Sequence, residues 1–189
     1  MTMTTTLPAV AGTTPWQIDP AHTEVEFSAR HLMISNVKGR FPNPSGSVSY
    51  DPDAPGSLRL DVTIPVAGID TRNEQRDAHL RSPDFFDVEH FPTMTFKGTR
   101  VEGEIGEEFR LVGELTIRGV TREVALDVTT EGGGGDPWGG ERLGFSAQGR
   151  IRRSEFGLTW NQLLESGGVA VSDEIKIILN VELARPKAA

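Results

Sequence analysis

Arg72, Arg76 and His79 are the residues of this chain whose types and spacing best fit a polar binding site. They recur at i, i+4 and i+7, a spacing that places side chains on one face of an α-helix. An arginine guanidinium presents a planar fork of donors that suits a phosphate or another oxygen acceptor. We therefore predict that this face binds the polar head group of a ligand. The alternative is that the three residues form an ordinary solvated helix face.

The helix that carries this face is predicted over about residues 72–81. Thr71 and Glu74 have the spacing of a capping box, which marks the start of a helix. The residues that follow include no Gly, Pro or β-branched residue until Ser82-Pro83, which prevents the helix from continuing. This is the one helix that the sequence predicts with a clear start and end.

The remaining candidates for chemistry form no recognisable catalytic or metal-binding motif. The chain has no cysteine, and its histidines match no zinc spacing. There is no G-x-S-x-G sequence, and the neighbouring Asp77 and His79 lack a convincing serine partner. We predict no catalytic residue, no metal and no cofactor.

Composition places the chain among ordinary globular proteins and excludes some partners. Hydrophobic residues make up 37% and charged residues 24% of the 189 positions. The net charge of -8 and the pI near 5.0 disfavour nucleic-acid binding, because neutralising phosphates needs a basic surface. The same charge disfavours broad adhesion to anionic membranes.

The chain is predicted to form one domain over residues 16–185, between a disordered tail at 1–15 and a short tail at 186–189. Its first fifteen residues have no basic start and no sustained apolar run, so they do not resemble a secretory signal. No apolar run approaches the roughly 20 residues of a membrane-spanning helix. We therefore expect a cytoplasmic protein.

Most of the chain outside the helix alternates apolar and polar residues, which predicts β-strands with one apolar face. The clearest runs are residues 58–64, 109–117 and 175–183. A two-residue turn is predicted with Gly119 at its first central position, and residues 132–140 are predicted to be a flexible connection. About eight antiparallel strands result. Periodicity does not choose between two packed sheets and a closed barrel.

Four stretches resemble the YceI-like polyisoprenoid-binding family, in order along the chain. Residues 76–96 read R-D-A-H-L-R-S-P-D-F-F-D-V-E-H-F-P-T-M-T-F, and residues 16–41 read W-Q-I-D-P-A-H-T-E-V-E-F-S-A-R-H-L-M-I-S-N-V-K-G-R-F. Residues 113–124 (G-E-L-T-I-R-G-V-T-R-E-V) and 152–161 (R-R-S-E-F-G-L-T-W-N) complete the match. The resemblance implies an all-β fold, an eight-stranded antiparallel lipocalin-like barrel with the short helix near its mouth. It also implies that the barrel holds a long isoprenoid lipid.

If such a lipid is bound, inward-facing apolar residues would contact its hydrocarbon tail, and Arg72, Arg76 and His79 would meet a phosphate or quinone oxygen on its head. Small inward residues, among them Ala29, Gly113, Ala147 and Gly149, would leave room for it, unless they only relieve crowding where strands bend. The predicted tail contacts are Phe27, Leu60, Val62, Phe85, Phe86, Met94, Phe96, Leu115, Phe145, Phe156, Trp160 and Ile177.

The resulting hypothesis is a non-catalytic protein that sequesters or carries a polyisoprenoid or prenyl-quinone-like lipid. One alternative is an enzyme, a hydrolase or isomerase, that acts on a prenylated substrate in the same cavity. Another is a lipid-free barrel that reports stress through partners. Transient membrane contact through the helix face and formation of a homodimer are left open by the sequence.

Overall fold

The computed structural model describes residues 15–51, 54–103, 105–165 and 167–186, which form ten β-strands and two short helices. The helices are α1 (Glu74–Arg81), between β5 and β6, and the 3-10 helix η1 (Arg153–Phe156), after β9. Residues 1–14 and 187–189, which include most of the two predicted tails, lie outside the described residues. The strands are β1 (Trp16–Ile18), β2 (Glu24–His31), β3 (Ser35–Phe41), β4 (Ser45–Asp51), β5 (Ala54–Pro65), β6 (Thr93–Glu102), β7 (Glu108–Ile117), β8 (Val120–Gly135), β9 (Gly140–Arg152) and β10 (Val171–Pro186).

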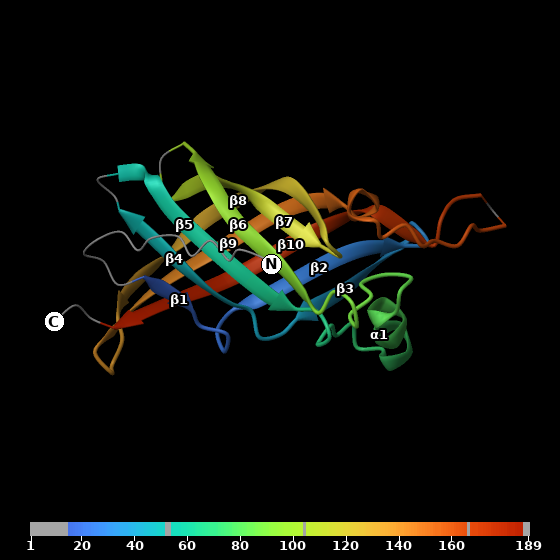
Figure 1. Cartoon of the computed structure of the whole chain (residues 1–189), viewed down its shortest axis with the longest axis horizontal. Coiled ribbons are helices and arrows are strands. Elements are labelled where there is room, and N and C mark those ends of the chain that lie inside the picture. The colour runs from blue at the N-terminus through green and yellow to red at the C-terminus, as the bar shows by residue number, and fades with distance from the viewer. Residues whose placement is uncertain (1–14, 52–53, 104, 166, 187–189) are drawn as a thin grey trace.

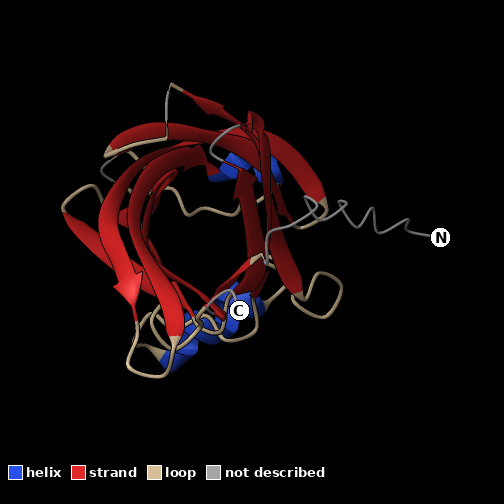
Figure 2. Ribbon diagram, turned by 90° about the vertical axis from the view of Figure 1, so that its left-hand side faces the viewer, coloured by secondary structure: helices blue, strands red, loops and turns tan. Residues whose placement is uncertain are grey.

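The strands close into an antiparallel barrel, whose long axis runs across Figure 1 and toward the viewer in Figure 2. Eight strands form the ring in the order β1-β4-β5-β6-β7-β8-β9-β10, and β1 pairs again with β10 to close it. β2 and β3 are two further strands that continue the sheet beyond β10. The predicted eight-stranded barrel with one short α-helix is confirmed, with these two strands in addition.

The length of β10 explains where the two extra strands lie. Its first part pairs with β2, with Lys176 opposite Ser28, and its last part pairs with β1, with Leu183 opposite Ile18. β3 pairs with β2, and β4 pairs with β1. β1 and β2 therefore follow one another along β10, and β3 and β4 follow one another beside them.

The two ends of the barrel differ in their connections (Figure 1). One end, called the helix end below, carries α1, the β7–β8 turn and residues 153–170. Here Arg118 of the β7–β8 turn donates from Nη1 to the carbonyl oxygen of Phe85 at 3.0 Å, and the ring centroids of His79 and Trp160 are 4.7 Å apart. The opposite end, called the turn end, carries the β8–β9 turn and the last residues of β10.

Helix α1 begins at Glu74, and the predicted capping box is wrong. Asn73 is the N-cap, and its side-chain oxygen accepts from the backbone N–H of Arg76 at 2.9 Å. Thr71 cannot cap the helix because its N–H and hydroxyl both donate to Asp77 Oδ1, at 2.9 and 2.5 Å. The predicted end of the helix holds, since the cap residue Ser82 directly precedes Pro83.

The β7–β8 turn is a two-residue turn, but it lies one residue earlier than predicted. Ile117 pairs with Val120, so Arg118 and Gly119 are its central residues. Both have positive φ, 49° and 74°, as a type I′ turn requires. Gly119 therefore occupies the second central position.

Glycine at Gly39 and Gly113 makes room for aromatic rings inside the barrel. A Cβ at Gly39 would lie 2.4 Å from Cζ of Phe27, which is directly opposite on β2. A Cβ at Gly113 would lie 2.5 Å from Cζ of Phe96 and 2.5 Å from the carbonyl oxygen of Lys97. The prediction that Gly113 leaves room for a ligand is therefore wrong, because the neighbouring phenylalanine fills that space.

The space beside the backbone of Gly149 is also filled by a neighbouring side chain. A Cβ there would lie 2.6 Å from Cδ2 of Leu126. Ala29 and Ala147, the other two small residues, do line the interior cavity described below.

Replacing Gly113 by alanine is expected to lower the free energy of unfolding by about 1–3 kcal/mol, because the strand or the Phe96 ring must shift. Gly144→Ala on β9 is the matched control, since the nearest atom to its Cβ is 3.5 Å away. Urea unfolding of both variants and the wild type measures the difference. Equal stability of the two variants would contradict the packing described here.

Candidate ligand-binding cavity

The barrel encloses a cavity of about 690 Å³. Its lining extends from Ile105 and Gly106, between β6 and β7, to Leu80 and Phe86 at the helix end. This volume lies within the roughly 300–1,000 Å³ of typical small-molecule sites. Apart from a few residues, the lining side chains are apolar. The polar exceptions are Thr23, Glu26, Tyr50, Thr130 and Arg153.

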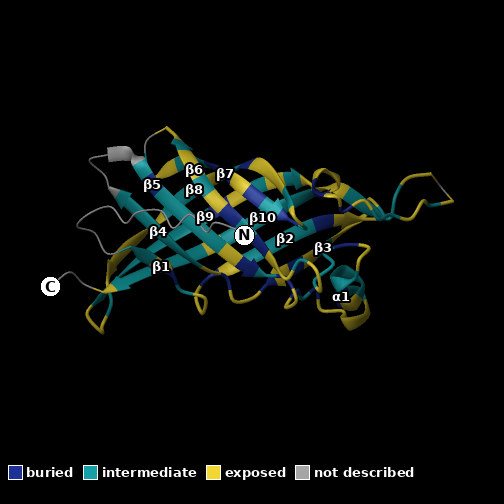
Figure 3. Cartoon of the chain, viewed as in Figure 1, coloured by how far each residue is buried: buried dark blue, intermediate teal, exposed yellow. Residues whose placement is uncertain are grey.

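Packing around the cavity is tight at the helix end and looser toward the turn end. At the helix end Ile64, Met94 and Ile117 are at most 7% exposed. Toward the turn end the strands are mostly intermediate in burial (Figure 3). There Phe109 and Phe145 are half-buried, and their ring centroids are 6.4 Å apart. The interior of an eight-stranded barrel is wide enough to hold one small ligand. Where side chains from opposite walls do not reach one another, space for a ligand is therefore expected.

Eleven of the twelve predicted tail-contact residues line this cavity. The exception is Trp160, whose ring instead packs against His79 and against Phe85, with centroid distances of 4.7 and 5.4 Å. Contact of these side chains with a lipid stays a prediction. The cavity residues that we did not single out include Val25, Phe41, Phe109, Leu111, Val128 and Leu179, all in strands with the same apolar alternation.

The predicted head-group residues do not form one face, and none of them lines the cavity. Arg72 precedes the helix, has a positive φ of 61° and is exposed. Arg76 donates from Nε and Nη2 to the hydroxyl and carbonyl oxygens of Thr71, both at 2.8 Å. His79 Nε2 lies 2.8 Å from Asp84 Oδ2. Head-group binding by the three stays a prediction, without a shared surface to support it.

Asp77 and Asn161 have structural roles near a helix start and a turn. Asp77 is buried and fastens the segment before α1 through Thr71. Asn161 donates to the carbonyl oxygen of Val171 at 2.8 Å and accepts from the N–H of Gln162 at 2.9 Å. Both side chains are used to satisfy local backbone or hydroxyl groups.

A buried cation at the helix end, Arg153, was not predicted as a site residue. It is 7% exposed and lines the cavity. Its guanidinium donates to the carbonyl oxygens of Leu158, Trp160 and Ser172, at 2.7 to 2.9 Å. Burial lowers the pKa of Arg153, and the charge of Asp173 opposes that shift. Arg153 thus fastens the segment between β9 and β10 to the barrel wall.

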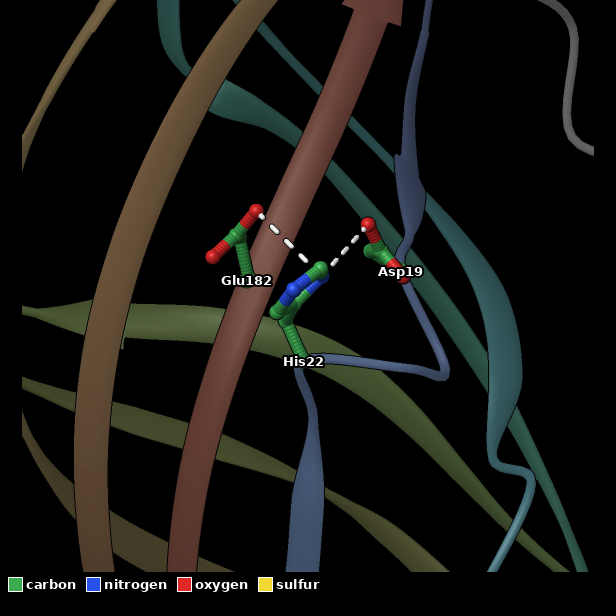
Figure 4. Close-up of side chains that lie close together, drawn as sticks. All are labelled: Asp19, His22 and Glu182. Carbon is green, nitrogen blue, oxygen red and sulfur yellow. Dashed lines mark hydrogen bonds and ion pairs between the residues drawn. The ribbon is translucent and has the colours of Figure 1, made fainter.

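Asp19, His22 and Glu182 form a cluster on the outside of the barrel (Figure 4). Potential metal-ligand atoms of the three lie within 4.8 Å of one another. However, Arg142 Nη1 lies 2.5 Å from Asp19 Oδ2 and 2.8 Å from Glu182 Oε1, so both carboxylates already have a cationic partner. The cluster is an ion-pair network that ties the β1–β2 turn to β9 and β10.

The fold and the cavity together define a class, the closed antiparallel β-barrels with an enclosed apolar ligand cavity. A YceI-like domain matches residues 16–183. Protein YceI of Salmonella newport (strain SL254) is 38% identical over 183 residues, which cover 97% of this chain and 92% of that protein. The chain therefore belongs to the YceI-like family.

Solved structures with a similar fold agree with this assignment. The crystal structure of the Campylobacter jejuni YCEI protein is 37% identical and has a TM-score of 0.70, over 84% of this chain and 90% of that chain. A polyisoprenoid binding domain from Saccharophagus degradans, implicated in plant cell wall breakdown, has a TM-score of 0.65 over 90% of this chain and 98% of that chain. At 15% identity, the second likeness concerns the fold alone.

The helices within the described ranges include none that is long and apolar enough to cross a membrane.

The Asp19 network predicts a specific dependence of stability on pH. The hydrogen bonds from His22 and Arg142 lower the pKa of Asp19 from 3.8 to about 2. Asp19 therefore stabilises the folded state fully above pH ~4, and this contribution is lost as the pH falls toward ~2. Asp19→Asn should reduce the free energy of unfolding by roughly 1–2 kcal/mol near neutral pH. Urea unfolding of both proteins should show the difference shrinking between about pH 4 and 2. A difference that stays constant over this range would contradict the assignment.

Proposed function

We propose that this protein binds a long-chain polyisoprenoid or prenyl-quinone-like lipid inside its barrel, and sequesters or carries the lipid without altering it. The observation that carries this proposal is the continuous apolar cavity of about 690 Å³. Membership of the YceI-like family and the structural likeness to a polyisoprenoid binding domain support the choice of ligand class.

The physical fit between such a ligand and the cavity is simple. An isoprenoid tail is a branched hydrocarbon without hydrogen-bonding groups, so it needs a long apolar enclosure and few polar contacts. At ~0.8 kcal/mol per buried carbon, each five-carbon unit contributes ~4 kcal/mol before the cost of ordering the tail. A few units in the barrel therefore suffice for tight binding.

Three of the five polar side chains of the cavity wall are used to satisfy backbone carbonyl oxygens. Thr23 and Thr130 donate their hydroxyl groups to the carbonyl oxygens of Glu182 and Gly106, and Arg153 donates to backbone carbonyls. These groups serve the fold. Among the described residues that line the cavity there is no histidine and no serine, so the wall offers no pairing of such a nucleophile with a histidine base.

Ala147→Trp tests the proposal by filling the cavity. Ala147 lines the cavity and is 7% exposed, so an indole there takes space that a lipid tail would occupy. The expected result is at least about a tenfold loss of affinity for a prenyl lipid, because several buried carbons lose their place. Binding is measured by titrating a detergent-solubilised polyprenol or prenyl quinone into lipid-free protein.

Gln148→Trp is the matched control, since the adjacent Gln148 side chain is exposed on the same strand. Circular dichroism and urea unfolding establish that both variants are folded. Unchanged affinity in a folded Ala147→Trp protein would contradict binding in the barrel.

A further inference from the structure

Three of the four exposed large apolar side chains of the described residues lie at the helix end. Met33 and Ile34 are 54% and 79% exposed in the β2–β3 turn, and Leu163 is 81% exposed in the segment between η1 and β10. The fourth, Trp138, is 84% exposed in the β8–β9 turn at the opposite end. Large apolar side chains gathered on a surface often mark an interaction site.

The two segments that carry these side chains are joined to one another. The backbone N–H of Leu32 donates to the carbonyl oxygen of Ala170 at 2.9 Å. Leu163 and Val169 form an antiparallel bridge, so the segment around them folds back on itself. It projects from the barrel at the right of Figure 1, beside the β2–β3 turn. We call Met33, Ile34 and Leu163 the apolar tip.

The backbone of the β2–β3 turn is unusual for the residues that it contains. Leu32 and Met33 have positive φ, 50° and 60°, a region that favours Gly and Asn and is rare for bulky side chains. Arg30 holds the turn, because its Nη2 donates to the carbonyl oxygen of Met33 at 2.6 Å. Local folding preference therefore does not explain why apolar residues stand here, and a functional constraint is the better explanation.

Exposed charged side chains of both signs lie near the apolar tip, and the whole chain carries a net charge of -8. Arg30, His31 and Lys38 are exposed on β2 and β3. The exposed acidic residues nearby are Glu165, on the segment that carries Leu163, and Asp173 and Glu174 near the start of β10, where Glu174 pairs with Arg150. Apolar side chains flanked by cations suit the interface of a bilayer, where the cations meet anionic lipid head groups.

The apolar tip also lies beside the wall of the cavity. Next to the β2–β3 turn, His31 of β2 pairs with Val171 of β10, and Ala29 pairs with Ile175. Val171, Ala29 and Ile175 all line the cavity. Leu80 and Phe86 line it at the same end. A bilayer in contact with the apolar tip would therefore face the helix end of the cavity.

We propose that the apolar tip docks this protein on a lipid bilayer that contains anionic phospholipid, with the helix end of the barrel against the membrane. Met33, Ile34 and Leu163 enter the interface, and Arg30 and Lys38 lie at the level of the head groups. Docking as such is independent of the proposed function. The consequence that lipid is exchanged at this end rests on it.

Flotation with phosphatidylcholine vesicles that contain roughly 30% phosphatidylglycerol tests the docking. The variant is Met33→Ser/Ile34→Ser/Leu163→Ser, and the matched control is Trp138→Ser, which removes an equally exposed apolar side chain at the other end. The wild type and the control should float with the vesicles, and the triple variant should partition at least about tenfold less. Leu163→Ser alone should show a smaller loss, and it keeps the test valid if the triple variant does not fold.

Three results would overturn the docking proposal: a wild type that does not float, equal flotation of the folded triple variant, or an equal loss in Trp138→Ser. Sedimentation velocity on the same proteins examines self-association. A wild-type dimer that becomes a monomer in the triple variant, without vesicle binding by the wild type, would assign the apolar tip to a second copy of the chain instead.

Lipid loading separates this inference from the proposed function. The triple variant should take up a prenyl lipid from detergent as the wild type does, and it should take up the same lipid from vesicles at least about tenfold more slowly. A protein that floats but takes up lipid from neither source would retain the docking site and contradict the proposed function. Equal transfer from vesicles by both proteins would contradict exchange at the helix end.

Discussion

Closure of the sheet through the pairing of β1 with β10 is the constraint on which the rest of the structure depends. It places Gln17 opposite Ala184, so segments from the two ends of the chain complete one ring. A closed ring of eight strands has an inside that only inward side chains or a ligand can occupy. Because the inward positions are almost all apolar, that inside is a hydrophobic compartment. The ion pairs of Arg142 with Asp19 and Glu182 lie at this junction and support it from outside.

The part of the sheet outside the ring is protected by the segment before α1. β3 is the last strand beyond β10, and its Arg40 exchanges two backbone hydrogen bonds with Asp70, both at 3.0 Å. The guanidinium of Arg40 also donates to Asp70 Oδ2. The backbone hydrogen bond from Arg72, followed by the side-chain bonds from Arg40, lowers the pKa of Asp70. The segment before α1, which includes the predicted head-group residue Arg72, thus covers part of this sheet edge.

The alternation of apolar residues predicted the strands and most of the cavity wall, because alternate side chains of a strand point to the same face. It could not predict how far opposite walls stand apart, and so it could not tell that Phe96 fills the space at Gly113 while Ala147 borders open space. The start of α1 was missed because Thr71 bonds Asp77, a competing partner that a capping motif does not reveal. Gly132–Gly135 pairs with β9 although its sequence resembles a loop, because backbone pairing needs no side chain.

Native mass spectrometry can show directly whether the barrel holds an isoprenoid lipid. The protein is purified from its own source without detergent, and the intact complex is weighed before its organic extract is identified. We expect one lipid per barrel, with a mass that the extract assigns to a prenyl chain, and loss of that mass after delipidation. Protein that carries no lipid as purified, and that remains empty after incubation with prenyl lipids, would contradict isoprenoid binding in the barrel.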